Sequence, residues 1–275
     1  MSEQDLVQIT QSYYDSSDAD NFYHTIWGGE DIHVGIYEPG DDIPKASHRT
    51  VVQMAEKLQP LTAELHLLDV GAGYGGAARY LARKYGCKVT CLNLSEVENE
   101  RNRLKSKEQG LDQLVDVVGG NFEALPFEDD SFDHIWSEDA FLHSGEKPKV
   151  IEECYRVLKP GGKLVFTDPM QADECPEGVL APVLERIHLR EMGSVAKYRD
   201  LAKQNGFSEF EAWEMPEQLV NHYGSVREQL IAHYDKLLKN GVSQAYLDRM
   251  KNGLSEWVKA GNNGYLNWGI ILMTK

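Results

Sequence analysis

The chain has 275 residues, 41% of them hydrophobic, which is long enough to bury a large core in one domain or two small ones. Its 28 basic residues stand against 44 acidic ones, and the formal net charge of −16 argues against nucleic acid or an anionic membrane as a partner. The sequence contains no apolar run long enough to span a membrane and no N-terminal signal pattern, so we expect a cytoplasmic protein that acts on a small molecule.

Apolar runs bounded by glycine alternate with helical patterns over residues 65–170. The expected strands are "LHLLDVGAG", "CKVTCLNLS", "DVVGGNF", "FDHIWS" and "GKLVFTDPM", and the helix over 147–158 ends at "KPGG". Later in the chain, "FSEFEAWEM" and "YLNWGIILMTK" are predicted as edge strands, and a long, mostly helical segment is predicted up to about residue 192. The pattern predicts an α/β fold with a doubly wound, Rossmann-like, mostly parallel seven-stranded sheet.

We expect one domain over residues 1–275. Within it, residues 1–60 form an N-terminal helical cap, 61–170 the core that holds the ligand, 171–240 an inserted helical lid and substrate region, and 241–275 a C-terminal helix and edge strand. The four cysteines show no CxxC spacing, which indicates free thiols and no metal site; they are Cys87, Cys91, Cys154 and Cys175.

The stretch "HLLDVGAGYGG", residues 66–76, carries the first functional signal. Gly71, Gly73 and Gly76 satisfy GxGxxG after a strand, the pattern with which a backbone approaches a dinucleotide pyrophosphate. A tight strand-to-helix turn without a ligand is the structural alternative.

Asp69 separates the nucleotide hypotheses. In a dinucleotide fold this position is normally apolar, because a buried, unpaired carboxylate is costly. A cationic ligand removes that cost, and the ammonium of S-adenosylmethionine is such a cation. The carboxylate therefore favours S-adenosylmethionine over a dinucleotide.

The same residues resemble the first motif of the class I S-adenosylmethionine-dependent methyltransferases, an acid followed by GxGxG, here Asp69 and Gly71 to Gly75. The resemblance continues in order to residue 170. One position departs from it: members often end the second strand in an acid that binds the ribose, where this chain has Asn93, with Glu98 one turn further on. The cofactor-binding residues that the resemblance implies are His33, Asp69, Gly71, Gly73, Asn93, Leu94, Glu98, Asn121, Phe122 and Ser137.

The segment "YYDSSDADNFYHTIWGGEDIHVGIYE" resembles the N-terminal cap of cyclopropane fatty acid synthases and of phosphoethanolamine, tocopherol and sarcosine/dimethylglycine methyltransferases. The resemblance implies that Tyr14 faces the transferred methyl group and that residues 33–35 contact the methionine carboxylate. Core packing is the alternative for Tyr14, for Trp27 and for His33.

"WSEDAFLHS" distinguishes among these relatives. Cyclopropane synthases place a bicarbonate-binding glutamate where this chain has Leu142, so that chemistry is not expected. "WGGEDIHVGIY", "IWSEDAFLHS", "TDPM" and "EMGSVAKYRDLAKQNGF" most closely resemble the sarcosine/dimethylglycine N-methyltransferases that make glycine betaine, a similarity that spans nearly the whole chain.

Methyl transfer to an amine is an in-line displacement that depends mainly on positioning. The amine must first lose its proton to water or to a base. We assign catalytic roles to Tyr14, His143 and Asp139. A structural histidine and a turn-capping aspartate are the alternatives for His143 and Asp139.

The substrate's carboxylate calls for a guanidinium, and of Arg186 and Arg190 in "LERIHLRE" we prefer Arg186. A surface ion pair with Glu185 or Asp173 is its alternative. The methylated nitrogen calls for ring faces, and the expected substrate-binding aromatic residues are Trp27, Phe141 and Tyr223, with Tyr14 as a further candidate.

We therefore predict a methyltransferase that converts sarcosine and dimethylglycine to glycine betaine with S-adenosylmethionine, as a monomer or homodimer. The alternatives are N-methylation of phosphoethanolamine or glycine, an NAD-dependent oxidoreductase, and a non-catalytic module that only binds S-adenosylmethionine. The acidic flanks of "ERIHLRE" disfavour a phosphorylated substrate.

Overall fold

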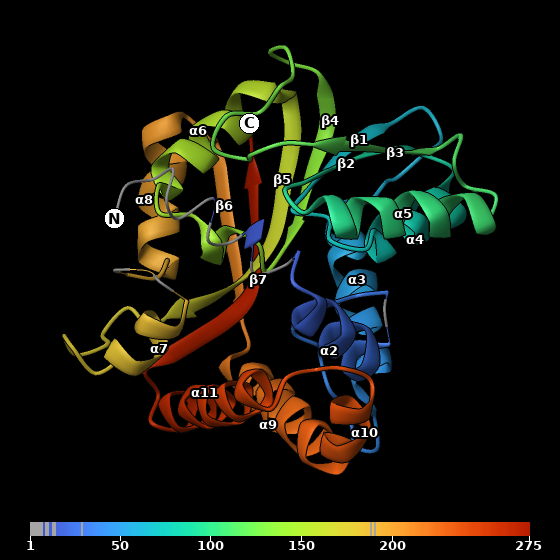
Figure 1. The fold of residues 1–275 in the computed structure, drawn as a ribbon. Helices are drawn as coiled ribbons and strands as arrows, with labels where there is room; N and C mark the ends of the chain where they lie inside the picture. The colour runs from blue at the N-terminus through green and yellow to red at the C-terminus, as the bar shows by residue number, and fades with distance from the viewer. Residues whose placement is uncertain (1–7, 9–10, 13–14, 29, 188, 190) are drawn as a thin grey trace.

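A computed structural model describes the chain except residues 1–7, 9–10, 13–14, 29, 188 and 190. Its seven strands form one sheet in the order β3-β2-β1-β4-β5-β7-β6 (Figure 1). The first five strands pair in parallel, and β7 runs antiparallel to both of its neighbours. This confirms the doubly wound, mostly parallel sheet. The strands are β1 (His66–Val70), β2 (Lys88–Asn93), β3 (Val115–Gly119), β4 (Phe132–Glu138), β5 (Leu158–Gln171), β6 (Glu209–Glu214) and β7 (Leu266–Thr274).

Helices connect and cover these strands. Several begin at a serine whose hydroxyl accepts a hydrogen bond from a first-turn amide, as Ser95 does at the start of α5. The described helices are α2 (Ser17–Trp27), α3 (Ile43–Lys57), α4 (Gly76–Tyr85), α5 (Glu96–Glu108), α6 (Lys147–Val157), α7 (Ala181–Arg186), α8 (Val195–Asn205), α9 (Pro216–Ala232), α10 (Tyr234–Lys239) and α11 (Gln244–Asn262), with a 3₁₀ turn η1 (Phe141–His143). None of them is both long and apolar enough to cross a membrane.

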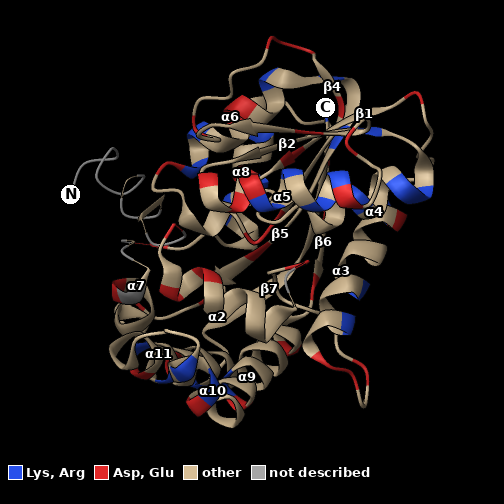
Figure 2. Ribbon diagram, turned by 45° about the vertical axis from the view of Figure 1, so that its right-hand side comes forward, with Lys and Arg blue, Asp and Glu red and all other residues tan. Residues whose placement is uncertain are grey.

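The sheet has an apolar core on each face, because side chains alternate along every strand. On one face, Leu67 and Trp136 pack with residues of α3 and α4. On the other, Leu68 and Ile135 pack with α6 and α8. A third cluster joins α2 to α9, α10 and α11, which lie together at one end of the sheet (Figure 1). Acidic and basic residues alternate along α5 (Figure 2).

Two expectations for the C-terminal half differ from the structure. β7 lies between β5 and β6, so only β6 is an edge strand on that side. Eight of the nine residues of β7 are buried, which is the pattern of an interior strand. The segment before residue 192 contains α7 as its one described helix, in a stretch interrupted by Pro176, Gly178 and Pro182.

Candidate active site

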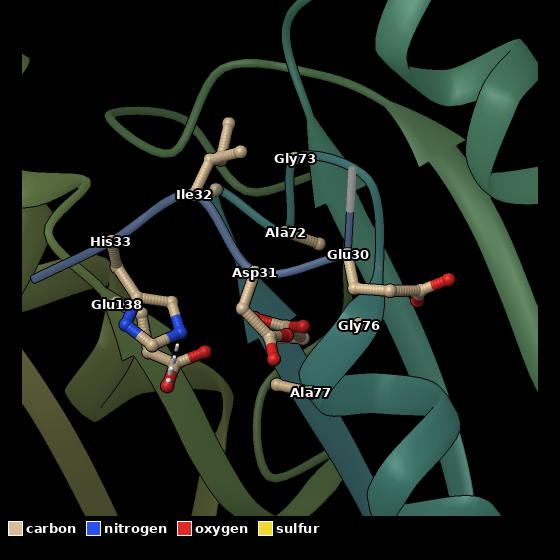
Figure 3. Close-up of a pocket in the computed structure, with 11 residues that line it drawn as sticks. Glu30, Asp31, Ile32, His33, Ala72, Gly73, Gly76, Ala77 and Glu138 are labelled. Carbon is tan, nitrogen blue, oxygen red and sulfur yellow. Dashed lines mark ion pairs between the residues drawn. The ribbon is translucent and has the colours of Figure 1, made fainter. Parts of the chain in front are cut away.

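A pocket opens where the turn after β1 meets the end of β4 and residues 30–33 of the N-terminal cap (Figure 3). The site lies at the carboxyl ends of the parallel strands, where ligands bind in open α/β sheets. Its described lining residues are Glu30, Asp31, Ile32, His33, Asp69, Gly71, Ala72, Gly73, Gly76, Ala77 and Glu138.

The glycines of the turn are required by close approach and by backbone conformation. Gly71 has φ +76°, and a Cβ there would lie 2.3 Å from the Cβ of Ala140. A Cβ on Gly76 would lie 2.0 Å from Oδ1 of Asp31, so this glycine makes room for the cap. The amides of Gly71 and Ala72 donate to the carbonyl of Leu92, at 2.8 and 3.2 Å. These two amides are thus engaged within the sheet, and they fix the start of the turn.

Asp69 is the next-to-last residue of β1, and its side chain is buried, at 3% exposure. Within the described residues, no hydrogen bond reaches that carboxylate. Burial raises its pKa well above the usual range, the charges of Glu138 and Asp31 raise it further, and His33 opposes them. A buried carboxylate without a donor is costly, and a ligand cation removes that cost. The residue therefore fits the ammonium of S-adenosylmethionine.

His33 and Glu138 form an ion pair beside Asp69, with Nε2 of the imidazole 3.2 Å from Oε1 of the carboxylate (Figure 3). Burial raises the pKa of Glu138 to about 7. Burial works against protonation of His33, but Glu138, Asp31 and Asp139 outweigh it and raise its pKa. The pair joins the cap to the end of β4.

Asn93 and Glu98 share the end of β2. Nδ2 of Asn93 donates to Oε2 of Glu98 at 2.8 Å, and burial raises the pKa of Glu98 to about 7. The acid that class members often place at the strand end is therefore present, but on the first turn of α5. Leu94 between them is half-buried, and its carbonyl accepts a 3.4 Å hydrogen bond from Gln11 of the cap.

The segment after β3 places Asn121 and Phe122 in half-buried positions. Oδ1 of Asn121 accepts from the Glu123 amide at 3.0 Å, which holds the turn. Ser137 is completely buried, and its hydroxyl donates to the carbonyl of Val70 at 2.7 Å. Its side chain thus ties β4 to β1, and the next residue, Glu138, lines the pocket.

Asp139 holds three distant segments together. Its Oδ2 accepts from the amide of Val34 at 2.7 Å, and its Oδ1 accepts from the indole of Trp268 at 2.8 Å. The residue has φ +51°, a conformation that costs energy for a side-chain-bearing residue. Burial raises its pKa. Both carboxylate oxygens are already engaged in joining β4, β7 and the cap.

His143 lies in η1, half-buried, and both of its neighbours are held by hydrogen bonds from or to ionisable side chains. The amide of Leu142 donates to Oδ1 of Asp168 at 2.7 Å, and Nζ of Lys147 donates to the carbonyl of Ser144 at 2.9 Å. Tyr198 in turn donates its hydroxyl to Oδ2 of Asp168 at 2.6 Å. The loop that carries the imidazole is therefore rigidly supported.

The expected substrate-binding aromatic residues divide into two groups. The rings of Trp27 and Tyr223 lie 5.4 and 5.7 Å from the ring of His222, so these residues share one aromatic cluster. Phe141 is completely buried, and its ring lies 5.1 Å from that of Phe166 in the core over α6 and α8. Phe141 is not among the residues that line the pocket.

Three other residues named from the sequence lie wholly or partly outside the part of the chain that the structure describes. Tyr14 and Arg190 lie outside the described residues. Arg186 lies in α7, but its side chain is likewise outside the described part.

Sequence reasoning missed Asp31, Glu138 and His222. Glu138 lies between Ser137 and Asp139, both of which the sequence predicts as site residues. Its position at the end of the same strand, β4, was the signal that could have identified it. His222 is completely buried, its Nδ1 accepts from the Gly35 amide at 3.1 Å, and burial lowers its pKa to about 3.

Comparison with known proteins adds a family pattern and close relatives. A family model described as a methyltransferase domain matches residues 68–166. The sarcosine/dimethylglycine N-methyltransferase of Aphanothece halophytica is 54% identical over 271 residues, which cover 98% of each chain. The enzyme of the same name from Halorhodospira halochloris is 52% identical over 270 residues, covering 98% of this chain and 96% of that one.

A solved structure shares the same arrangement. It is described as a "putative sarcosine dimethylglycine methyltransferase" from Galdieria sulphuraria, with 43% identity and a TM-score of 0.91. The match covers 96% of this chain and 98% of that one. The similarity thus includes the cap and the C-terminal helices as well as the sheet.

Proposed function

We infer the reaction from the family, because the chain belongs to the class I S-adenosylmethionine-dependent methyltransferases and, within them, to the sarcosine/dimethylglycine N-methyltransferases. We propose that it methylates the nitrogen of sarcosine and then that of dimethylglycine, giving glycine betaine. The observation that carries this proposal is the 54% identity over 98% of both chains.

The chemistry that bound S-adenosylmethionine supplies is an electrophilic methyl group on a sulfonium ion. Asp69 would hold the cofactor's ammonium, as its buried carboxylate without a hydrogen bond supports. Asn93 and Glu98 would hold the ribose hydroxyls, since their mutual hydrogen bond leaves further lone pairs available. Leu94, Asn121 and Phe122 would surround the adenine.

Positioning of the amine is the main task of the substrate side. We propose that Trp27 and Tyr223 present ring faces to the nitrogen as it gains a fixed positive charge. Arg186 is the proposed partner of the substrate's carboxylate. Phe141, completely buried in the core over α6 and α8, would support this part of the sheet rather than contact the nitrogen.

The amine must lose its proton before its lone pair attacks. We propose His143 as the acceptor of that proton, directly or through water, with Tyr14 near the reacting methyl group. Asp139 is less suited to this role, because protonating it would disturb its hydrogen bonds with Val34 and Trp268. Its support of the cap makes it a positioning residue in this proposal.

The proposal also concerns the protein's surroundings. All four cysteines are free, which is the usual state in a reducing cytoplasm, and the net charge of −16 fits a small-molecule substrate better than nucleic acid. We propose that the protein acts in the cytoplasm as a monomer or homodimer.

A parallel product assay tests the reaction. The purified chain is incubated with S-adenosylmethionine and either glycine, sarcosine, dimethylglycine or phosphoethanolamine, and the methylated products are identified by mass. We expect turnover of sarcosine and dimethylglycine. Equal turnover of glycine would widen the substrate class, turnover of phosphoethanolamine alone would overturn the proposal, and binding without any turnover would indicate a non-catalytic module.

A further inference from the structure

The cofactor pocket holds more carboxyl groups than one ammonium requires. Four carboxylates line it, and His33 is the one imidazole; no lysine or arginine is among its described lining residues. Glu30 is paired outside the pocket with Arg79 and with Lys105, the latter at 3.0 Å. The carboxylates of Asp31, Asp69 and Glu138 therefore remain to face the one imidazole that lines the pocket. Asp31 also has Nδ1 of the exposed His48 at 3.9 Å from its Oδ2.

These three carboxylates are buried and poorly provided with hydrogen bonds. The side chains of Asp31 and Glu138 are 9% and 10% exposed. Among the described residues, no hydrogen bond reaches Oδ1 of Asp31, and Oε1 of Glu138 has only its ion pair with Nε2 of His33. Asp69 also accepts no hydrogen bond within those residues. Figure 3 shows the side chains of Asp31 and Glu138 on the same side of the cap segment, together with His33. Buried charges act on a ligand with little screening, so the cluster points to a ligand that carries excess positive charge.

We propose that Asp31 and Glu138, in addition to Asp69, make this pocket bind the positively charged sulfonium form of the cofactor in preference to its neutral thioether product, S-adenosylhomocysteine. The two ligands carry the same ammonium and the same carboxylate. They differ by one methyl group and one positive charge on sulfur. A bond between Asp69 and the ammonium stabilises both ligands equally, whereas the field of the additional carboxylates distinguishes them.

This selection concerns ligand exchange rather than the chemical step. During methyl transfer the positive charge moves from sulfur to the attacking nitrogen, and the total charge in the site stays the same. A negative field that stabilises the bound cofactor as strongly as the transition state does not raise the rate of transfer. Once the charge has left sulfur and the methylated product has departed, the neutral thioether has lost that stabilisation and leaves more readily.

Calorimetric titration without any amine tests the selection. The probes are S-adenosylmethionine, S-adenosylhomocysteine and sinefungin, which carries a charged amine at the position of the sulfonium. The variants are wild type, Asp31→Asn and Asp200→Asn. The last removes the same charge from an exposed position on α8 and serves as the matched control.

We expect the wild-type protein to prefer sinefungin over S-adenosylhomocysteine, as it prefers S-adenosylmethionine. Asp31→Asn should lower the preference for S-adenosylmethionine over S-adenosylhomocysteine about tenfold, and Asp200→Asn should leave it unchanged. An equal loss for both ligands, or sinefungin behaving like the neutral product, would overturn the inference. The unfolding transition of each variant checks that it is folded.

A second variant keeps the test decisive if Asp31→Asn does not fold. Glu138→Gln should also lower the preference, but by less, because His33 then loses its partner and with it part of its own positive charge. An unchanged preference in every folded variant would contradict the proposal.

The pH dependence of the same titration is a further test. Burial places the pKa of Glu138 at about 7, so the carboxyl is mostly neutral at pH 6 and mostly charged at pH 8. The preference for the sulfonium should therefore rise over this interval, and a flat profile would contradict the inference. The groups that face Glu138 or Asp31 are His33, His48, Asp69, Arg79, Asp139, Glu30 and the indole of Trp136.

The outcome does not depend on the amine that is methylated. If the selection is found but no amine is turned over, the proposed function fails and this inference stands. If amines are turned over and both ligands respond alike to Asp31→Asn, only this inference fails.

Discussion

Two buried carboxylates near the carboxyl ends of strands in the same sheet have opposite surroundings. Asp69 on β1 and Asp168 on β5 are 3% and 0% exposed, and burial raises the pKa of both. Asp168 accepts hydrogen bonds from Leu142 and Tyr198, whereas no hydrogen bond reaches Asp69 in the described part of the chain. A carboxylate whose oxygens are engaged by the protein supports the architecture, and one left without donors awaits a ligand.

The largest effect should follow from Asp69→Asn. The amide cannot neutralise the cofactor's ammonium, and losing one partner of a buried charge pair weakens affinity for S-adenosylmethionine about a hundredfold. The cofactor-free protein should keep its midpoint of thermal unfolding or gain stability, because a buried acid without a donor has been removed. Calorimetric titration and thermal unfolding measure the two quantities.

The opposite pair of results would contradict the distinction between Asp69 and Asp168. Unchanged affinity together with lost stability would show that Asp69 supports the fold and that the ammonium binds elsewhere.

The next largest effect should follow from Asp168→Asn, with the opposite distribution. The amide can accept only at its one oxygen, so the hydrogen bond from Tyr198 or from Leu142 is weakened, and the free energy of unfolding should fall by about 2 kcal/mol. Cofactor affinity should change less than threefold. Chemical denaturation gives the stability, and Tyr198→Phe, which removes one of the two bonds, should cost about 1 kcal/mol.

Methylation rates would test the loop as well. Leu142 precedes His143, and Asp168→Asn weakens the hydrogen bond that holds its amide. This substitution should therefore lower kcat more than it raises KM for the amine. Equal changes in stability for Asp69→Asn and Asp168→Asn would remove the distinction between the two sites.

The parts that sequence predicted share a local physical cause. The alternation of strands and helices over residues 65–170 follows from periodicity within each segment, and the structure confirms it. Asp69 was identified by the cost of burying it, which holds whatever its partners are. Glu98 could be identified from the sequence because it lies only five residues after Asn93, in the first turn of α5.

The parts that sequence did not predict depend on distant partners. The sequence predicts Asp139 as a base or a cap, yet its carboxylate accepts hydrogen bonds from residues 105 and 129 positions away in the chain. The sequence predicts β7 as an edge strand, but it pairs with β5 and with β6, each of which lies far from it in the chain. Such pairings are set by tertiary packing, which no local pattern encodes.

The smallest effect that still separates the two carboxylates is a pH dependence of stability. In the unfolded chain these groups lose their protons near pH 4, whereas in the folded protein Asp168 and Glu138 keep them up to about pH 7 and Asp69 also keeps its proton well above its usual range. The stability that they contribute is present at low pH and is lost as pH rises through 7. The raised pKa of His33 acts in the same direction.

The window for this measurement lies above pH 6.5, because the lowered pKa values of His66, His134 and His222 affect stability mainly below it. We expect Asp168 alone to lower the free energy of unfolding of the cofactor-free protein by about 1 kcal/mol between pH 6.5 and 8, and the other carboxyls with raised pKa values to add to this fall. Saturating S-adenosylmethionine should reduce this slope, because Asp69 is then ionised in the folded protein, while the part due to Asp168 should remain. A slope that is the same with and without cofactor would mean that Asp69 is as fully engaged by the protein as Asp168, and the distinction between a supporting and a ligand-binding carboxylate would fail.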